Sequence, residues 1–417
     1  CRMGCPIENE IPRFIQAIAH GNFGLANDIL AERTNLPSIC GRVCPRENQC
    51  EGNCIMNKAK KPPINIGKLE RFAADFESIN ELRKPKKIKQ DLGKVAVVGS
   101  GPAGLSVAGD IAKLGYEVTV FEGQSEPGGV LLFGIPEFRL SKSVVRREIA
   151  RLEGLGVKFV CNTFIGQDKT LDELFAEGFD SIFIGTGTHI PQEVRMENDE
   201  VHGVFQAMYL LTNVQLVENG ELDAEQIPVK KGDRVIIIGG GNVAMDAART
   251  CVRLGCESVT VAYRRSQEQM PALLSEYEEA RAEGVQFQWF ASPVGVEGKD
   301  KVEGFKYEVM ALNEDGAGIH GTGKFQVMPV DKIIIAAGHK PNARLIGEGN
   351  NLKVDEKGYI ITSEDPYGMT NRDGVFAGGD VVHKPATVVL AMREAKKAVD
   401  GMVKYMEIKK AQESANQ

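Results

Sequence analysis

The residues best suited to chemistry in this chain are cysteines near its amino end. Six of the nine cysteines lie in the first 54 residues: Cys1, Cys5, Cys40, Cys44, Cys50 and Cys54. The strings CRMGCP and CGRVCP both read CxxxCP, a pattern that ends the ligand run of two-cluster ferredoxins. Iron–sulfur ligation is therefore the favoured interpretation. Zinc is a weaker alternative because five residues separate Cys44 from Cys50, and structural zinc pairs favour two to four. Disulfides are weaker still in a cytoplasmic chain.

A second chemical feature is a glycine-rich loop that follows an apolar run. Gly99, Gly101 and Gly104 form GxGxxG in KVAVVGSGPAGL, and Glu122 ends the next apolar run. Such glycines permit a tight turn, close approach of a pyrophosphate and close packing of helix on strand, while the acid accepts hydrogen bonds from ribose hydroxyls. The pattern predicts a dinucleotide site.

The same pattern returns later with a different ending. RVIIIGGGNVAMD carries Gly239, Gly241 and Ala244 as GxGxxA, but the second strand ends in Tyr263, Arg264 and Arg265 instead of an acid. A carboxylate there would repel a 2′-phosphate, whereas guanidinium groups pair with it. This site therefore favours NADP over NAD, with the alternative that both arginines only end a solvated strand.

These loops must be positioned by strand–helix–strand units, which we expect at residues 94–123 and 234–265. The strings FDSIFIGTGTH and DKIIIAAGHKPN, residues 179–189 and 331–342, look like strands where one domain is left and re-entered. Residues 1 to about 83 read as short helices between cysteine-bearing loops, and the basic stretch 83–93 reads as a solvated connection.

The sequence thus predicts an α/β fold with two Rossmann-like dinucleotide-binding domains, the second inserted in the first, preceded by an α-helical iron–sulfur domain. The expected boundaries are 1–88 for the helical domain, 89–200 and 330–417 for the two parts of the first dinucleotide domain, and 201–329 for the inserted domain.

Two further strings carry candidate residues. GVFAGGDVV places Gly379 and Asp380 after a short apolar run, where Asp380 would hydrogen-bond ribityl hydroxyls of a flavin or simply close a turn. Cys251 and Cys256 form the only close cysteine pair in the dinucleotide domains. They fall on and after the crossover helix, so we expect buried structural cysteines and no flavin-facing disulfide.

Composition excludes some classes of function. The net charge of −7 argues against nucleic-acid binding, which needs clustered and uncompensated Lys and Arg. No apolar run approaches the length of a membrane span, and no signal segment opens the chain, so the expected compartment is the cytoplasm. Because the chain begins at Cys1 and not at Met, residues upstream are expected to be missing.

In combination, the motifs CGRVCP, CEGNC, INIGKLERF, GSGPAGL, PEFRL, GGGNVAMD, YRR and FAGGD give the whole chain a family resemblance. It resembles the small (beta) subunit of NADPH-dependent glutamate synthase, and is similar to the N-terminal half of dihydropyrimidine dehydrogenase and the large subunit of NADH-dependent ferredoxin:NADP oxidoreductase. The resemblance implies FAD in the discontinuous domain, NADPH in the inserted domain and two [4Fe-4S] clusters.

The resemblance also implies ligands for the clusters. Cys5, Cys44, Cys50 and Glu70 of INIGKLERF would serve one cluster, and Cys1 and Cys54 the other, whose first two cysteines would precede residue 1. Cys40 aligns with a cysteine that is not a ligand. Without the first two cysteines, the completeness of the second cluster is open.

Further cofactor contacts are implied in the same way. For FAD the resemblance brings Gly99, Ser100, Gly101, Pro102, Ala103, Gly104, Glu122, Gly128, Gly129, Val130, Arg139, Ile165, Gly379 and Asp380, with Thr387 and Val388 near the isoalloxazine. For NADPH it brings Gly239, Gly240, Gly241, Asn242, Val243, Arg264, Arg265, Ala336, Ala337 and Gly338. No proton-transfer catalyst is expected, because hydride transfer needs stacked rings and exclusion of water more than an acid or base.

The expected function is that of an NADPH-dependent oxidoreductase subunit that passes electrons through FAD and [4Fe-4S] to a partner. The leading partner is the catalytic large subunit of glutamate synthase, and a ferredoxin:NADP oxidoreductase partner is the alternative. From other classes, a redox-sensing protein without turnover and a free-standing disulfide reductase remain open.

Overall fold

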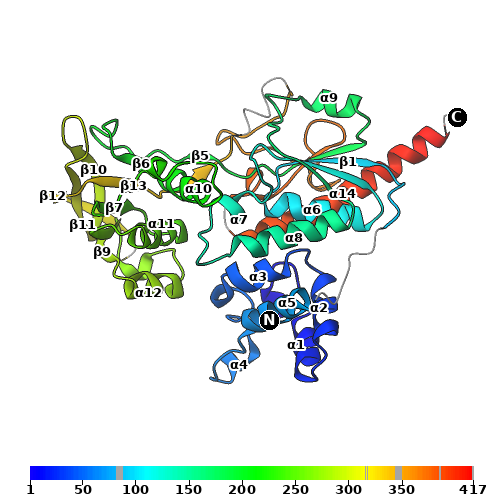
Figure 1. Ribbon diagram of the computed structural model, residues 1–417, viewed down its shortest axis with the longest axis horizontal. Helices are drawn as coiled ribbons and strands as arrows, with labels where there is room; N and C mark the ends of the chain where they lie inside the picture. Colours follow the sequence, from blue (N-terminus) through cyan, green and yellow to red (C-terminus); the bar gives the residue numbers. More distant parts are fainter. Residues whose placement is uncertain (81–87, 315, 317, 343–349, 385–386, 416–417) are drawn as a thin grey trace. The chain divides into compact units, whose positions relative to one another are not determined.

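The computed structural model describes residues 1–80, 88–314, 316, 318–342, 350–384 and 387–415 (Figure 1). Residues 83–87 of the connection expected at 83–93 lie outside the described residues. The chain forms two compact units. The first contains Cys1–Leu132, Glu137–Ile190 and Lys340–Gln417, and the second contains Phe133–Pro136 and Pro191–His339. Each unit is described by itself below.

The first unit opens with a cluster of short helices. They are α1 (Ile11–Ala19), α2 (Phe23–Ala31), α3 (Pro37–Val43), α4 (Ile55–Lys58) and α5 (Ile66–Ile79), with 3-10 turns η1 (Arg2–Gly4) and η2 (Arg46–Asn48). Phe14, Leu30 and Ile66 are buried where α1, α2 and α5 meet. Proline at the start of α1 and α3 suits the first helical turn, where a missing N–H costs nothing. The short helices between cysteines match the expectation.

The rest of the first unit is a five-stranded parallel sheet in the order β15-β4-β1-β2-β3. Its strands are β1 (Lys94–Val98), β2 (Glu117–Phe121), β3 (Lys158–Val160), β4 (Ser181–Ile184) and β15 (Val375–Ala377). The central strands are continuous apolar runs because both faces are covered. One face carries α6 (Pro102–Lys113), α8 (Lys142–Gly154) and α14 (Val388–Ala415), and α9 (Leu171–Ala176) lies on the other (Figure 1).

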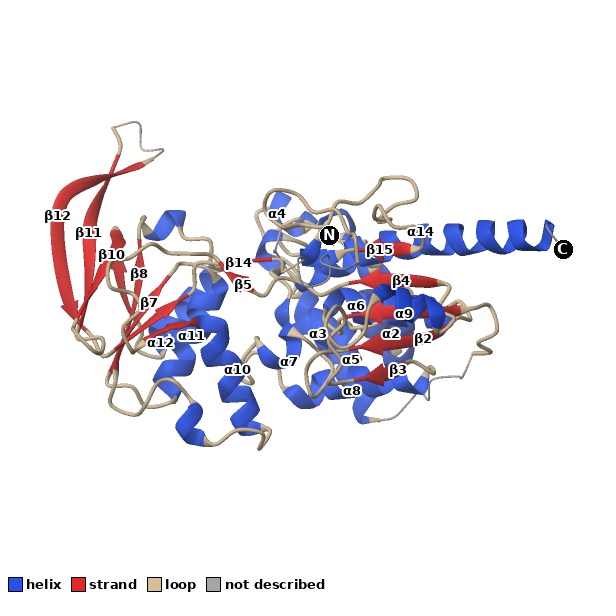
Figure 2. Ribbon diagram, turned by 90° about the horizontal axis from the view of Figure 1, so that it is seen from above, coloured by secondary structure: helices blue, strands red, loops and turns tan. Residues whose placement is uncertain are grey.

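The second unit contains a parallel sheet in the order β6-β13-β7-β8-β9. Its strands are β6 (Val204–Gln206), β7 (Arg234–Ile238), β8 (Ser258–Tyr263), β9 (Gln286–Trp289) and β13 (Lys332–Ile335), with helices α10 (Ala207–Glu218), α11 (Asn242–Arg253) and α12 (Leu274–Ala282). An antiparallel sheet of β10 (Ala291–Glu297), β11 (Gly304–Leu312) and β12 (Ile319–Pro329) adjoins it (Figure 2). The sequence analysis did not anticipate this second sheet.

In both parallel sheets the strand before the glycine loop, β1 or β7, lies at the centre, and the strand order reverses beside it. The chain leaves and re-enters the first unit through β5 (Ile190–Pro191) and β14 (His339–Lys340), which pair as a two-stranded sheet. The predicted fold class, with one Rossmann-like domain inserted in another, is confirmed. The inserted unit of the structure is longer at both ends than the expected 201–329. No helix in the described part of the chain is long and apolar enough to cross a membrane.

Candidate cofactor sites

The first glycine loop joins β1 to α6. Gly99 has a φ of +94°, and a Cβ at Gly104 would lie 1.9 Å from the Gly99 carbonyl oxygen, so both positions exclude larger residues. A Cβ at Gly101, in contrast, would meet no atom within 4 Å. Pro102 and Ala103 open α6 behind this space. The loop therefore leaves an open cradle at the helix N-terminus, which fits a pyrophosphate.

Glu122 lies at the end of β2 and holds this loop in place. Its carboxylate accepts hydrogen bonds from the Ser100 backbone N–H at 3.0 Å, from the Ser100 hydroxyl and from the Gln124 N–H at 2.9 Å. The Gly128 N–H in turn donates to the Ser100 hydroxyl oxygen at 2.8 Å. Because an ionised carboxylate offers about four acceptor positions, one remains for a ribose hydroxyl. The ribose contact of Glu122 stays a prediction.

Two separate segments converge on the first loop. A Cβ at Gly129 would lie 2.9 Å from the Gly101 Cα, and a Cβ at Gly379 would lie 2.8 Å from the Ala103 Cβ. Asp380 follows Gly379, and burial raises the pKa of its carboxyl to about 6. A partly buried carboxylate beside an open cradle suits a ligand rich in hydroxyl donors, as the FAD ribityl chain is.

The structure gives the positions of the other residues that are expected to contact FAD. Val130 begins α7 (Val130–Phe133) and is exposed, Arg139 lies half-buried in the turn that follows, and Ile165 is buried beneath α9. The Thr387 hydroxyl accepts the Leu390 N–H at the start of α14, next to Val388. Their contacts with FAD stay predictions.

The second glycine loop, between β7 and α11, repeats the geometry of the first. A Cβ at Gly239 would lie 2.5 Å from the Ala336 carbonyl oxygen, and one at Gly240 would lie 2.6 Å from the Tyr263 ring, whereas one at Gly241 would meet nothing within 4 Å. The Asn242 side chain accepts the Leu273 N–H at 2.9 Å. This loop also presents an open cradle at a helix N-terminus.

The residues around this cradle divide into packing and exposed groups. Val243 packs against the core, and Ala336, Ala337 and Gly338 follow β13 beside the loop. Arg264 and Arg265 are exposed immediately after β8. Among the described residues neither guanidinium forms an ion pair. Both are available to an anionic ligand, which fits a 2′-phosphate.

The predicted cluster ligands meet around one cavity in the helical part of the first unit. Cys5, Cys44, Cys50 and Glu70 line it, together with Cys40. Burial raises the pKa of Cys5 to about 11 and that of Cys50 to about 12, and it raises the pKa of Glu70 to about 8. Asn9 alone donates a side-chain hydrogen bond to Glu70, at 3.4 Å, within the described part of the chain.

This donor set fits an iron–sulfur cluster better than a single metal ion. In the described ranges no three His, Cys, Asp or Glu residues converge as ligands of one ion. A four-iron cluster takes one protein ligand at each iron, so its ligands surround a volume and do not converge on a point. Buried thiolates and a buried carboxylate are costly unless a cation compensates them. The cavity therefore fits a [4Fe-4S] cluster.

The other cysteines of this region lie elsewhere. Cys1 and Cys54 do not line the cavity. The Cys1 ammonium donates a hydrogen bond to the carbonyl of Asn53 at 3.1 Å, and Asn53 directly precedes Cys54 in the chain. Cys40 is buried, with its thiol 3.9 Å from the Met392 sulfur. The assignment of Cys40 as a bystander stays a prediction.

Sequence reasoning missed how α14 links the two sites of the first unit. Val389 lines the cluster cavity, and Met392, one turn later, contacts Cys40. Thr387 and Val388, expected near the isoalloxazine, immediately precede Val389. The first turn of α14 therefore lies between the predicted flavin and cluster sites. No motif in the sequence signals this contact between residues more than 300 positions apart.

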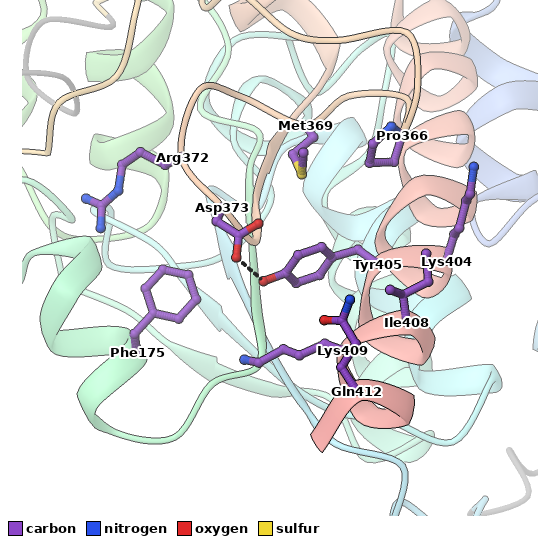
Figure 3. Close-up of a pocket in the computed structure, with 10 residues that line it drawn as sticks. All are labelled: Phe175, Pro366, Met369, Arg372, Asp373, Lys404, Tyr405, Ile408, Lys409 and Gln412. Carbon is purple, nitrogen blue, oxygen red and sulfur yellow. Dashed lines mark hydrogen bonds between the residues drawn. The ribbon is translucent and has the colours of Figure 1, made fainter. Parts of the chain in front are cut away.

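A cavity of about 740 Å³ in the first unit lies away from all these residues. Figure 3 shows it lined by α9, the end of α14 and the loop before β15, where the Tyr405 hydroxyl donates to Asp373 at 2.8 Å. Its residues flank the amino end of β15, whereas ligands of parallel α/β sheets bind at the carboxyl ends. We assign it no cofactor.

Comparison with known proteins gives a family for each part of the chain. Residues 93–395 match the pyridine nucleotide-disulphide oxidoreductase family, and residues 1–82 match the dihydropyrimidine dehydrogenase domain II, 4Fe-4S cluster family. FprA from Mycobacterium tuberculosis in complex with NADPH has a similar fold, with a TM-score of 0.62, 20% identity and coverage of 78% of this chain and 86% of FprA. The fold and sites thus define a flavoprotein with two dinucleotide-binding domains.

Three curated relatives match 97% or more of this chain. The glutamate synthase [NADPH] small chain of Escherichia coli K12 is 36% identical, with 89% of its length covered. The NAD-dependent dihydropyrimidine dehydrogenase subunit PreT of Escherichia coli O157:H7 is 34% identical, with 91% covered. The NADP(+)-dependent formate dehydrogenase subunit beta of Moorella thermoacetica is 34% identical, with 60% covered.

The chain belongs to the pyridine nucleotide-disulphide oxidoreductase family, in the group that includes the small chain of glutamate synthase. It is an NADPH-dependent oxidoreductase whose cofactors are FAD, NADPH and [4Fe-4S].

Proposed function

We propose that this chain is the electron-donating small subunit of an NADPH-dependent glutamate synthase. It takes electrons from NADPH and delivers them, through FAD and [4Fe-4S], to a catalytic large subunit. The 36% identity to a glutamate synthase small chain over 98% of this chain supports the proposal. The observation that carries it is the contact of α14 with the cluster cavity, because that helix begins at the predicted flavin site.

In the proposed function, the two glycine loops bind FAD and NADPH. The open spaces at Gly101 and Gly241 receive the pyrophosphates of FAD and NADPH, and the first N–H groups of α6 and α11 donate to them. Arg264 and Arg265 pair with the 2′-phosphate. When bound, the nicotinamide and flavin supply hydride transfer and the iron–sulfur clusters supply single-electron transfer.

The cluster cavity supplies the exit for electrons. Cys5, Cys44, Cys50 and Glu70 hold one cluster, and the burial of Cys50 and Glu70 limits the access of water to it. The packing of Val389 and Met392 beside these residues leaves only the first turn of α14 between the flavin and the cluster. This arrangement suits delivery to a partner protein, and it leaves no role for a flavin-facing disulfide.

We propose the large subunit of glutamate synthase as the partner and the cytoplasm as the compartment. Free thiols in all nine cysteines agree with a reducing compartment. The names of the relatives include other partners, so the partner must be identified by experiment.

The test combines this chain, produced anaerobically, with a candidate large subunit. We expect a stable complex that forms glutamate from glutamine and 2-oxoglutarate only when NADPH is present. Reduction of ferredoxin, with no glutamate formed, would instead support the alternative oxidoreductase. NADPH that fails to bleach the flavin absorbance would overturn both.

A further inference from the structure

Two thiols, Cys251 and Cys256, lie at the far end of α11, outside the cofactor sites. The glycine loop of the second unit precedes the first residue of α11, and Cys251 lies in its last turn. A helix of 12 residues is about 18 Å long. The pair is therefore remote from the pyrophosphate cradle at Gly241 and cannot act as a disulfide facing the coenzyme.

Backbone geometry at the end of α11 brings these two residues together. Gly255 has a φ of +84°. The Cys256 N–H donates to the Cys251 carbonyl at 3.2 Å, and the Gly255 N–H donates to the Val252 carbonyl at 3.0 Å. This pair of bonds defines a Schellman cap, in which the side chains at the two ends of the longer bond come into contact. Cys251 and Cys256 occupy those two positions.

The same cap, with a glycine of positive φ before its final residue, ends six other helices in the described part of the chain. Both paired residues are apolar after four of them: Ile111 with Tyr116 after α6, Leu152 with Val157 after α8, Leu174 with Phe179 after α9, and Ala280 with Val285 after α12. After α1 and α10 the pairs are Ala17 with Asn22 and Leu216 with Glu221. The cap therefore forms without cysteine, and the α11 cap differs from these six in pairing two cysteines.

The two thiols are not equivalent. Cys251 is fully buried, whereas Cys256 is partly exposed. This exposure differs from the expectation that both are buried structural residues, because the chain at Cys256 has already turned out of the helix. The Cys256 thiol donates to the Lys230 carbonyl at 3.7 Å. Interaction between the two neighbouring thiols lowers the pKa of Cys256 and raises the pKa of Cys251. Cys256 is thus the accessible and more nucleophilic partner.

We propose that Cys251 and Cys256 are an oxidisable dithiol, which a small-molecule disulfide converts into a reversible disulfide across the α11 cap. The Cys256 thiolate attacks one sulfur of the external disulfide and displaces one thiolate. The Cys251 thiol then loses its proton, attacks the Cys256 sulfur and displaces the second thiol. Two protein thiols are oxidised, and one external disulfide is reduced to two thiols. This inference does not depend on the proposed function.

The test treats the anaerobically prepared holoenzyme with oxidised glutathione, followed by acid quenching, alkylation and tryptic digestion without reductant. Cleavage after Arg249, Arg253 and Arg264 puts the two cysteines in separate peptides, 250–253 and 254–264. We expect these peptides to appear joined, and alkylation of both cysteines to fall by about fivefold or more. Treatment with dithiothreitol should restore alkylation.

Cys161 is the matched control within the same chain. It is also partly exposed, but it has no thiol partner, and burial together with nearby carboxylates raises its pKa. Its peptide, 159–169, should remain alkylated under the same conditions. Loss of alkylation at Cys161 equal to that at Cys256 would overturn the proposal, because it would show unselective oxidation.

Two variants separate the steps. Cys251→Ser should accumulate glutathione on Cys256, since no second thiol displaces it. Cys256→Ser should leave Cys251 unmodified, since its thiol is buried. Glutathione that persists on Cys256 in the unsubstituted chain, or an unmodified Cys256, would overturn the proposal.

Discussion

At the scale of single residues, charge and burial decide what each candidate side chain can do. Arg264 and Arg265 end β8 at the position where Glu122 ends β2 in the other unit. Both arginines are exposed, whereas Glu122 is buried and accepts hydrogen bonds from its own loop. One topology thus places opposite charges after the second strand of the two glycine-loop units.

The coenzyme preference can be tested at Arg264. Arg264→Ala should lower kcat/KM for NADPH by about 10- to 100-fold, because a charge-assisted bond to the 2′-phosphate is lost. The kcat/KM of this variant for NADH should stay within about twofold of that of the unsubstituted chain. Steady-state reduction of an artificial acceptor measures both. Arg281→Ala, on α12 of the same unit, is the control. If Arg264→Ala lowered kcat/KM equally for NADPH and NADH, the assignment of Arg264 to the 2′-phosphate would be wrong.

The cluster ligands can be tested by pairing Cys44 with Cys40. Both line the cavity, but only Cys44 is proposed to bind iron. Cys44→Ala should lose most of the iron and acid-labile sulfide of that cluster while retaining FAD, because one cluster ligand is missing. Cys40→Ala should retain the iron. Equal iron loss in the two variants would contradict the assignment of Cys40 as a bystander.

Asp380 gives a prediction about pH. Because the pKa of its carboxyl is raised to about 6, folding favours the protonated form, and wild-type stability falls as pH rises from the ordinary value of 3.8 through 6. Asp380→Asn removes this cost, so the FAD-free protein should gain on the order of 2 kcal/mol at pH 8. The gain should be smaller at pH 5. Thermal midpoints at the two pH values test this, and an equal gain at both would argue against a buried ionisation.

At the scale of elements, the chain builds two cofactor cradles in one way. In each, a glycine of positive φ turns the chain out of a central strand, and the middle glycine of the motif faces open space before a helix N-terminus. The third position, Gly104 or Ala244, is buried where the helix packs on the strand. The middle glycine is therefore the position where a side chain blocks the ligand and not the fold.

Reciprocal substitutions test the two cradles. Gly101→Val should expel FAD, because a branched side chain fills the space of the pyrophosphate, and the purified protein should lose its flavin absorbance. Gly241→Val should retain FAD but weaken NADPH binding by about tenfold or more. Each variant is the control for the other. Loss of FAD from Gly241→Val would contradict the assignment of the second cradle to NADPH.

At the scale of the whole molecule, the proposed function assigns electron entry and exit to different parts of the sequence. Entry would use the inserted unit, and exit would use the helical segment at the amino end, which packs against α14 from the carboxyl end of the chain. These functions should be separable by a single substitution.

Cys44→Ala provides that separation. NADPH should still bleach the flavin of this variant at a rate within about twofold of the unsubstituted chain, because both dinucleotide sites are intact. Delivery of electrons to the partner should fall by more than about tenfold, since the exit is broken. Stopped-flow absorbance and coupled glutamate formation measure the two rates. Partner reduction that survives the loss of iron would refute the proposed exit route.

The sequence by itself determined the strand–glycine–helix units, the nesting of one dinucleotide domain in another and the concentration of thiols at the amino end. These features are local, because apolar runs, glycine spacing and helix starts act within about 30 residues. The charge difference between Glu122 and Arg264 was equally visible, since each residue follows its strand directly.

Only the tertiary structure decided which distant residues share a site. Glu70 and Cys40 reach the cluster cavity because α3 and α5 pack together there, and Val389 reaches it from the other end of the chain. The antiparallel sheet β10-β11-β12 and the thiol contact after α11 were likewise invisible in sequence patterns. Such contacts are set by packing between elements, which depends on side-chain shape across the whole core and leaves no periodic signal along the chain.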